Sequence, residues 1–250
     1  MSKVPNKTSR RSFLATGATL VAATSAGITP ALASDPETSP LPAGAGVSLL
    51  ADSARKVGLD AKQLSMTHDI KPMNPVRDAI FGPAVTTKWE VGRKGGSAQD
   101  IKEYMFHPLD AAAKGSIWVI ESGTDRLLSM FGGLIGLGCK RQGLAGAVTD
   151  NGCRDLAEFR DADFPVFAKG SVPFGPGDFI RPVGANVPIV CGGVAVNPGD
   201  WVAADQDGVL VIPKDRVPEV IEAAIELLAK EDSVRREIES GATLANAYKL

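Results

Sequence analysis

Arg154 and Asp155 are two adjacent residues of this 250-residue chain that could do chemistry together. They follow a predicted strand at 145–150 and a tight turn through Asn151 and Gly152. Ligands usually bind beyond the ends of strands in α/β sheets, and a guanidinium fork matches the geometry of a carboxylate. Adjacent Arg-Asp pairs are more often solvated surface pairs, so the place at a strand end is what favours a binding site.

A glycine segment further upstream supplies the other half of this candidate site. Gly132, Gly133, Leu134 and Ile135 lie near the start of a predicted helix at 127–141. Small residues there leave backbone N–H groups open to an anion, and the helix dipole favours negative charge. Helical glycines more often serve close packing, so the segment is weak evidence alone. Together, an anion pocket, a guanidinium and a carboxylate could converge.

The elements that must position these residues form a βαβ unit. A compact apolar strand is predicted at 116–121, the glycine-containing helix at 127–141 and the next strand at 145–150. This order implies two parallel strands joined by a right-handed crossover.

The rest of the chain continues an α/β pattern. Helices are predicted at 46–59, 100–113 and 217–240, the last of them long and amphipathic. Strands are predicted at 80–87 and 164–168, and then as short segments separated by turns at 188–191, 193–196, 201–204 and 208–212. We expect one α/β domain over residues 47–250.

Composition and charge narrow the functional classes. Apolar residues make up 44% of the chain and charged residues 22%, which is ordinary for a globular protein. The net charge of −2 gives no reason to expect nucleic acid or an anionic membrane surface as a partner. Residues 1–33 hold four of the 27 basic residues and no acidic residue, so the remainder is mildly acidic.

The N-terminus has the features of an export signal. Arg10 and Arg11 precede a mildly apolar run at 15–28 and the small-x-small sequence Ala31-Leu32-Ala33. This order is typical of a twin-arginine signal peptide with a cleavage site. The run is too short and too weakly apolar for a stable membrane anchor. We therefore expect a signal at 1–33, a linker at 34–46 and an exported, periplasmic protein.

Cysteine and histidine offer little further chemistry. Cys139, Cys153 and Cys191 are an odd set without CxxC spacing, so we expect free, buried thiols rather than disulfides or a zinc site. His68 and His107 are candidates for a general acid or base by residue type only, and we expect both to be structural or surface residues. No nucleotide-binding glycine fingerprint is present.

The sequence Gly-Ala-Val-Thr-Asp-Asn-Gly-Cys-Arg-Asp at 146–155 resembles the G-x-V-x-D-G-x-x-R-D signature of the RraA-like family. That family includes class II 4-hydroxy-4-methyl-2-oxoglutarate/4-carboxy-4-hydroxy-2-oxoadipate aldolases. Further matches lie at 81–86, 164–167, 197–205 and 207–213, in the family's order. The resemblance covers residues 47 to the C-terminus. It implies a three-layer β/β/α swivelling domain, assembled as a homotrimer or homohexamer.

The resemblance also implies a reaction. Asp155 matches the ligand of a divalent metal, Mg²⁺ or Mn²⁺, and Arg154 matches the catalytic residue that binds the substrate and stabilises a pyruvate enolate. The backbone at Gly132, Gly133, Leu134 and Ile135 matches the segment that holds the substrate carboxylate. The implied activity is retro-aldol cleavage of a 4-hydroxy-2-oxo dicarboxylic acid, with oxaloacetate decarboxylation as a side activity.

Two departures from the family pattern limit this expectation. Gly133 stands where the family usually has an acid, which puts aldol specificity or proton transfer in doubt. Asn151 replaces a glycine, and we expect the turn to survive because Asn tolerates left-handed backbone geometry. The alternative is a non-catalytic regulatory protein, since the family contains a regulator of ribonuclease activity. That branch lacks the Asp of the Arg-Asp pair, so Asp155 favours an enzyme.

Overall fold

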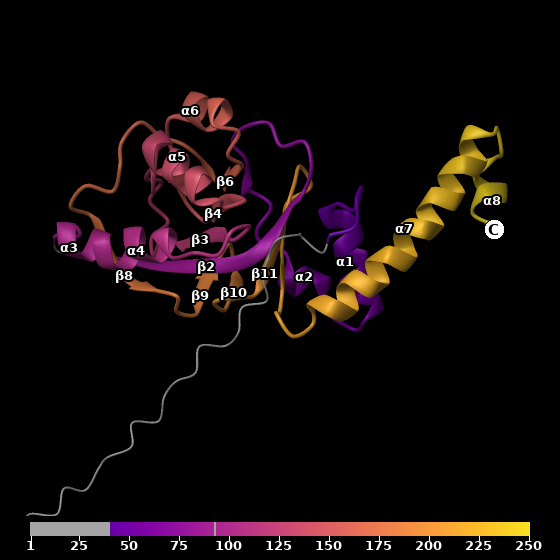
Figure 1. Cartoon of the computed structure of the whole chain (residues 1–250), viewed down its shortest axis with the longest axis horizontal. Helices are drawn as coiled ribbons and strands as arrows, with labels where there is room; N and C mark the ends of the chain where they lie inside the picture. The colour runs from indigo at the N-terminus through magenta and orange to yellow at the C-terminus, as the bar shows by residue number, and fades with distance from the viewer. Residues whose placement is uncertain (1–40, 93) are drawn as a thin grey trace, which may run out of the picture. The chain divides into compact units, whose positions relative to one another are not determined.

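The structure, a computed structural model, describes residues 41–92 and 94–250 (Figure 1). The expected signal at 1–33 and residues 34–40 of the expected linker lie outside the described residues. Within the rest of that linker, Ala45 is buried next to the first helix, α1 (Val47–Lys56).

The main sheet has eight strands and is mostly parallel at the centre. Its order is β1 (Lys71–Pro72), β6 (Val166–Ala168), β4 (Gly146–Thr149), β3 (Ile117–Glu121), β2 (Ile80–Val91), β11 (Trp201–Ala204) and β12 (Val209–Ile212), with β8 (Ile180–Ala185) also paired to β2. Strands β2, β3, β4 and β6 run parallel, whereas β1, β8, β11 and β12 pair antiparallel to their neighbours. The predicted parallel pair of β3 and β4 is confirmed.

Two helices cover one face of the sheet. They are α5 (Gly133–Gln142) and α6 (Leu156–Asp161), and Figure 1 shows both on the same side of β3 and β4. The core beneath them is aromatic, because Trp118 of β3, Phe131 before α5 and Phe159 of α6 are all buried. The Trp118 and Phe131 ring centroids lie 4.8 Å apart, and those of Phe131 and Phe159 lie 5.5 Å apart. This cluster ties both helices to the sheet.

A small hairpin covers the opposite face. Strands β9 (Ile189–Cys191) and β10 (Val194–Val196) pair antiparallel, and their alternate residues turn inward. Ile189, Cys191 and Val196 pack there with apolar side chains of β3, β4 and β6. Helix layer, main sheet and hairpin give three layers, so the expected three-layer β/β/α class is confirmed.

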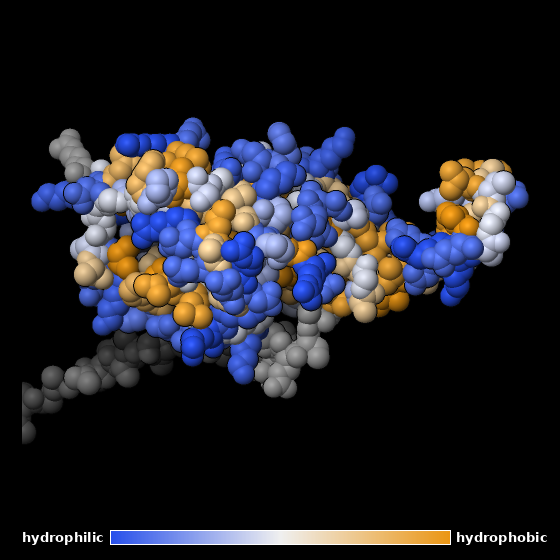
Figure 2. Space-filling view, turned by 90° about the horizontal axis from the view of Figure 1, so that it is seen from above, coloured by the Kyte–Doolittle hydropathy of each residue, from blue (hydrophilic) through white to orange (hydrophobic). Residues whose placement is uncertain are grey.

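A third core lies at the β12 edge of the sheet. Helix α1 and the N-terminal half of α7 (Val217–Glu239) pack there, burying Leu50, Ala54, Val220 and Ala224. Short α2 (Ala61–Leu64) lies nearby, and α8 (Leu244–Ala247) packs against α7. Figure 2 shows hydrophobic residues gathered where α8 ends the chain. Leu244 and Tyr248 are 68% and 59% exposed there, which leaves an apolar surface uncovered.

The predicted helix at 100–113 is formed as three consecutive pieces. They are α3 (Ala98–Ile101), the π-helical segment η1 (Lys102–Phe106) and α4 (His107–Asp110). A capping box begins this helix, because the Ser97 and Asp100 side chains each accept the other's backbone N–H. Among residues 41–92 and 94–250, no helix combines the length and apolar content that a membrane crossing needs.

The start of α5 corrects one prediction. The helix expected at 127–141 begins only at Gly133, because residues 128–131 run extended beside the segment that follows β4. Gly132 is extended at the N-cap of α5. The glycine segment therefore lies at the true N-terminus of the helix, which strengthens its interpretation as an anion-binding turn.

Candidate active site

Two loops at the carboxyl ends of β3 and β4 build the candidate site. Ser129 forms an isolated parallel bridge with Gly152, and Met130 N donates to Gly152 O at 2.9 Å. Further along, Arg154 N donates to Phe131 O at 3.3 Å. Because these backbone hydrogen bonds hold the two loops side by side, Gly132 and Asp155 are in contact although they are distant in sequence. The convergence that the sequence suggested is confirmed for Gly132, Gly133, Arg154 and Asp155.

Asn151 holds this pair of loops in a way that the sequence did not predict. Its backbone is not left-handed, so the tolerance of Asn for that geometry is not needed at this position. Instead the buried side chain accepts from Leu128 N at 2.7 Å and donates to the carbonyls of Thr124 and Arg126, both at 3.1 Å. An amide bonded on both sides fixes the loop that leads to Gly132.

Asp155 is the residue that adopts the left-handed conformation, with φ 63° and ψ 43°. This geometry costs a non-glycine residue about 1–2 kcal/mol, and such strain gathers at functional sites. Asp155 also occupies the N-cap of α6, yet its side chain makes no capping bond. A capping aspartate usually stabilises a helix by about 1 kcal/mol. Asp155 lacks this stabilisation and also carries the backbone strain, while its carboxylate lies away from the N-cap position.

The Asp155 carboxylate points at the N-terminus of α5. Its Oδ2 accepts the N–H of Gly133 at 3.1 Å and lies 3.6 Å from Nε of Arg154. The Asp155 and Arg154 side chains are 40% and 46% exposed, so a small ligand can reach both. The site therefore presents one carboxylate and one guanidinium to solvent, held against a helix N-terminus that favours negative charge.

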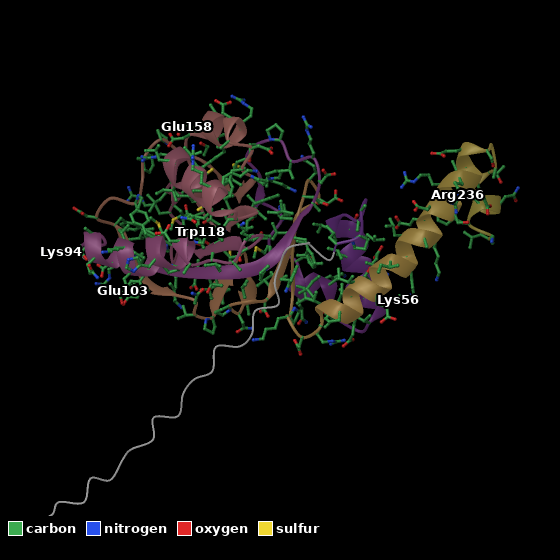
Figure 3. The ribbon with its side chains drawn as sticks, viewed as in Figure 1. Lys56, Lys94, Glu103, Trp118, Glu158 and Arg236 are labelled. Atoms are coloured by element: carbon green, nitrogen blue, oxygen red, sulfur yellow. The ribbon has the colours of Figure 1, made fainter. Side chains whose placement is uncertain are left out.

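The two glycines leave room for acidic and basic side chains. A Cβ built on Gly132 would lie 3.1 Å from Cγ and Nε of Arg154 and closer still to Oδ2 of Asp155. A Cβ built on Gly133 would lie 2.5 Å from Cβ and Cδ of Glu158 and closer still to its Oε2. A side chain at 133 would collide with Cβ of Glu158, and one at 132 would displace the Asp155 carboxylate. Figure 3 shows Glu158 on α6.

Glu158 was not identified from the sequence. The available signal was the spacing Asp155-Leu-Ala-Glu158, which is that of a capping box at a helix start. Neither bond of such a box is formed among the described residues, and the Glu158 carboxylate has no hydrogen-bond or ion-pair partner there.

The predicted carboxylate-binding backbone is only partly available. Gly133 N–H is already engaged by Asp155, and Ile135 N–H bonds to Gly132 O at 3.1 Å. The N–H groups of Gly132 and Leu134 donate to no partner in the described part of the chain. Leu134 is also 80% exposed. Gly132 is buried, so a substrate carboxylate at this turn would be received by Leu134 N–H rather than by the whole segment.

Phe159 fixes α6 against α5. Its ring is fully buried, and a Cβ built on Gly136 would lie 2.6 Å from Cε1 of that ring. Gly136, the second glycine of α5, therefore admits an aromatic ring from α6. This contact sets the spacing of the two helix starts, and thereby the positions of Asp155 and Glu158 relative to Gly133.

The other predicted residues lie outside the site. His68 and His107 are both exposed, on a turn and at the start of α4, as expected of surface residues. The three cysteines are free and buried, as expected. Burial raises the pKa of the Cys153 thiol to about 12, so this neighbour of Arg154 stays a neutral thiol. Burial likewise raises the pKa of the Asp150 carboxyl, whose Oδ1 accepts Ser122 N–H.

The donor set fits a hard divalent cation. No group of three or more His, Cys, Asp or Glu residues that could hold a metal is found in residues 41–92 and 94–250. Mg²⁺ nevertheless keeps several waters and is commonly bound through one or two carboxylates plus substrate oxygens. Asp155 with solvent access meets that description. Zinc would require a nitrogen or sulfur set that these residues do not offer.

A groove between α7 and α8 offers less chemistry. It is lined partly by Leu227, Val234, Ile238 and Tyr248, together with charged residues that bear no special geometry. Apolar lining of this kind is typical of a surface that another protein covers. The strained carboxylate at Asp155 is therefore the better candidate for an active site.

Known proteins resemble this chain over most of its length. The model of a family described as RraA-like, Aldolase/RraA, matches residues 47–211, which include every site residue named above. A protein of Halalkalibacterium halodurans named "Putative 4-hydroxy-4-methyl-2-oxoglutarate aldolase" is 32% identical over 189 residues, covering 74% of this chain and 83% of that protein.

One further relative and one solved structure also match this chain. Protein DlpA of Legionella pneumophila is 30% identical over 202 residues, or 79% of this chain, but the match spans only 31% of DlpA. A crystal structure of Streptomyces coelicolor RraAS2, described as an unusual member of the RNase ES inhibitor RraA family, has a TM-score of 0.67 at 23% identity. The structural match covers 77% of this chain and 93% of RraAS2. At this identity the match supports the fold alone.

Proposed function

The chain belongs to the RraA-like family, and from that premise we propose that it is a divalent-metal-dependent lyase. The proposed reaction is retro-aldol cleavage of a 4-hydroxy-2-oxo dicarboxylic acid to pyruvate and a second carbonyl compound, with oxaloacetate decarboxylation as a side activity. A relative that is 32% identical and carries an aldolase name supports a carbon–carbon lyase. The observation that carries the proposal is the strained, exposed Asp155 carboxylate beside Arg154.

Asp155, Leu134 and Arg154 have different proposed roles, which follow from the charge or dipole of each group. Asp155 is the proposed ligand of Mg²⁺ or Mn²⁺, because a carboxylate is a preferred donor for hard cations. Leu134 N–H receives the substrate carboxylate at the N-terminus of α5. Arg154, 46% exposed, presents its guanidinium to the oxygen that becomes negative. A lysine would lack the planar fork that fits such an oxyanion.

Cleavage breaks the C3–C4 bond of the substrate. The 4-hydroxyl loses its proton as the new carbonyl forms, and the electron pair of the bond passes to a pyruvate enolate. Arg154 stabilises this enolate until C3 is protonated. When bound, the divalent metal would supply Lewis-acid polarisation of the 2-oxo group, typically several kcal/mol of charge stabilisation.

A panel of 2-oxo acids tests this proposal. Purified protein with Mg²⁺ or Mn²⁺ is expected to release pyruvate from at least one 4-hydroxy-2-oxo diacid, followed through lactate dehydrogenase, and EDTA is expected to stop the reaction. Oxaloacetate, whose decarboxylation gives the same enolate, is the second substrate to include. Absence of pyruvate from every acid with either metal would favour the non-catalytic, regulatory alternative.

We also propose that the protein assembles as a homotrimer or homohexamer. Ile225, Leu244 and Tyr248 are more than half exposed on α7 and α8, and a second copy would cover this apolar surface. The net charge of −2 gives no reason to propose nucleic acid as a partner.

Export through the twin-arginine route is a separate proposal. It rests on Arg10, Arg11 and the Ala31-Leu32-Ala33 sequence. Changing both arginines to lysine is expected to retain the protein in the cytoplasm, measured by fractionation against the unchanged protein. Undiminished recovery from the periplasm would contradict this route.

A further inference from the structure

We infer that Glu158 is the second functional carboxylate of the site, and that Gly133 is glycine in order to admit it. With Asp155 it would provide two anionic oxygen donors for a divalent cation, both from side chains that lie against Gly133. The inference rests on the proposed function of the Asp155 site and extends it to a residue that the sequence did not single out.

Glu158 occupies the space in which a side chain of residue 133 would lie. A side chain at this position could not coexist with Glu158, because its Cβ would lie 2.5 Å from both Cβ and Cδ of Glu158. The same glycine donates its N–H to Asp155 Oδ2 at 3.1 Å. Both carboxylates therefore lie against a single residue, at the first turn of α5, although neither belongs to that helix.

Glu158 forms no capping bond at the start of α6. At the third position of α6, after an acidic N-cap, a glutamate would ordinarily accept the N–H of the N-cap residue and complete a capping box. That bond is missing in the described part of the chain, and neither carboxylate caps its own helix. Both carboxylates lie beside Gly133, and among the described residues Arg154 is the one cationic side chain that forms an ion pair with either of them.

Repulsion between the two carboxylates also favours a cation at this site. Two carboxylates near one another repel, which is unfavourable unless a cation or proton lies between them. A divalent cation of the Mg²⁺ type is commonly held by one or two carboxylates, with water and substrate oxygens completing its shell. Arg154 forms an ion pair with Asp155 and with no other acid among the described residues of the site, so a divalent cation would supply a positive charge next to Glu158.

Mn²⁺ binding without substrate tests the inference. Glu158→Gln keeps the shape of the side chain and removes its charge. We expect this variant to bind Mn²⁺ about 10–100-fold more weakly than the unchanged protein. The affinity is measured by calorimetry or by electron paramagnetic resonance of Mn²⁺. The matched control is Asp161→Asn, at the exposed end of the same helix, which is expected to bind Mn²⁺ as the unchanged protein does.

A relocation variant separates a charge effect from a structural one. Gly133→Asp alone is expected to disturb the site, because Glu158 already fills the space. Gly133→Asp combined with Glu158→Gly moves a carboxylate from α6 to α5 and removes the steric conflict. We expect this pair to recover at least half of the Mn²⁺ affinity, on a logarithmic scale, that Glu158→Gln loses.

Each outcome bears on one proposal. Unchanged Mn²⁺ affinity in Glu158→Gln would overturn the role of Glu158, even if the protein cleaves a 4-hydroxy-2-oxo acid. Weakened Mn²⁺ binding in a protein that cleaves none of the acids would support Glu158 and contradict the proposed lyase activity. Absence of Mn²⁺ binding by the unchanged protein would overturn the two-carboxylate site.

Discussion

Asp155→Asn is expected to lower metal-dependent pyruvate release by about 100-fold or more. Asn tolerates the left-handed backbone that Asp155 adopts and keeps an oxygen that can accept Gly133 N–H. The substitution therefore removes the negative charge and little else. Loss of a metal-held charge stabilisation of about 3 kcal/mol corresponds to a factor of this size in rate.

The measurement is kcat/KM with saturating Mg²⁺ or Mn²⁺, beside Mn²⁺ affinity without substrate. Asp163→Asn is the matched control, because Asp163 is also left-handed, at φ 49°, but lies on the surface after α6. We expect its rate to stay within about twofold of the unchanged protein, since an isolated surface pair contributes little. Equal rates in Asp155→Asn and in the control would contradict the assignment of the metal ligand.

Phe159→Ala is expected to lower the free energy of unfolding by about 3–5 kcal/mol. The ring is fully buried between Phe131 and Gly136, so truncation removes apolar contact and leaves a cavity. For a domain of this size the melting temperature would fall by about 10 °C. Since α6 carries Asp155 and Glu158 on its first turn, Mn²⁺ affinity is expected to fall as well.

Phe159→Leu provides the comparison for this variant. A leucine keeps much of the buried volume, so we expect a smaller loss of stability, measured by urea unfolding at one fixed protein concentration. A change below about 1 kcal/mol for Phe159→Ala would mean that the α5–α6 contact does not hold the two helix starts together.

The strands that position this site could be predicted from the sequence. Short apolar runs placed β3 and β4 correctly, and the order strand, helix, strand required them to be parallel. Because both loops leave the same edge of the sheet, the convergence of Gly132 with Asp155 followed from local pattern and general topology.

What the sequence could not provide were the long-range contacts. The start of α5 was placed too early, since the extended course of 128–131 depends on pairing with Gly152. The role of Asn151 depends on carbonyls of Thr124 and Arg126, which no local pattern indicates. Glu158 was overlooked for the same reason, because its neighbour Gly133 is distant in sequence and has no side chain to suggest a contact.

The overlap of positions 133 and 158 has an evolutionary consequence. Only one of the two can carry a side chain, since even the two Cβ atoms would lie 2.5 Å apart. An acid at 133 would thus be harmful while Glu158 is present and beneficial once residue 158 is glycine, which is sign epistasis. A lineage exchanging one arrangement for the other would have to pass through a form with glycine at both positions and a single acid at the site. Descendants would therefore tend to retain whichever arrangement they inherited.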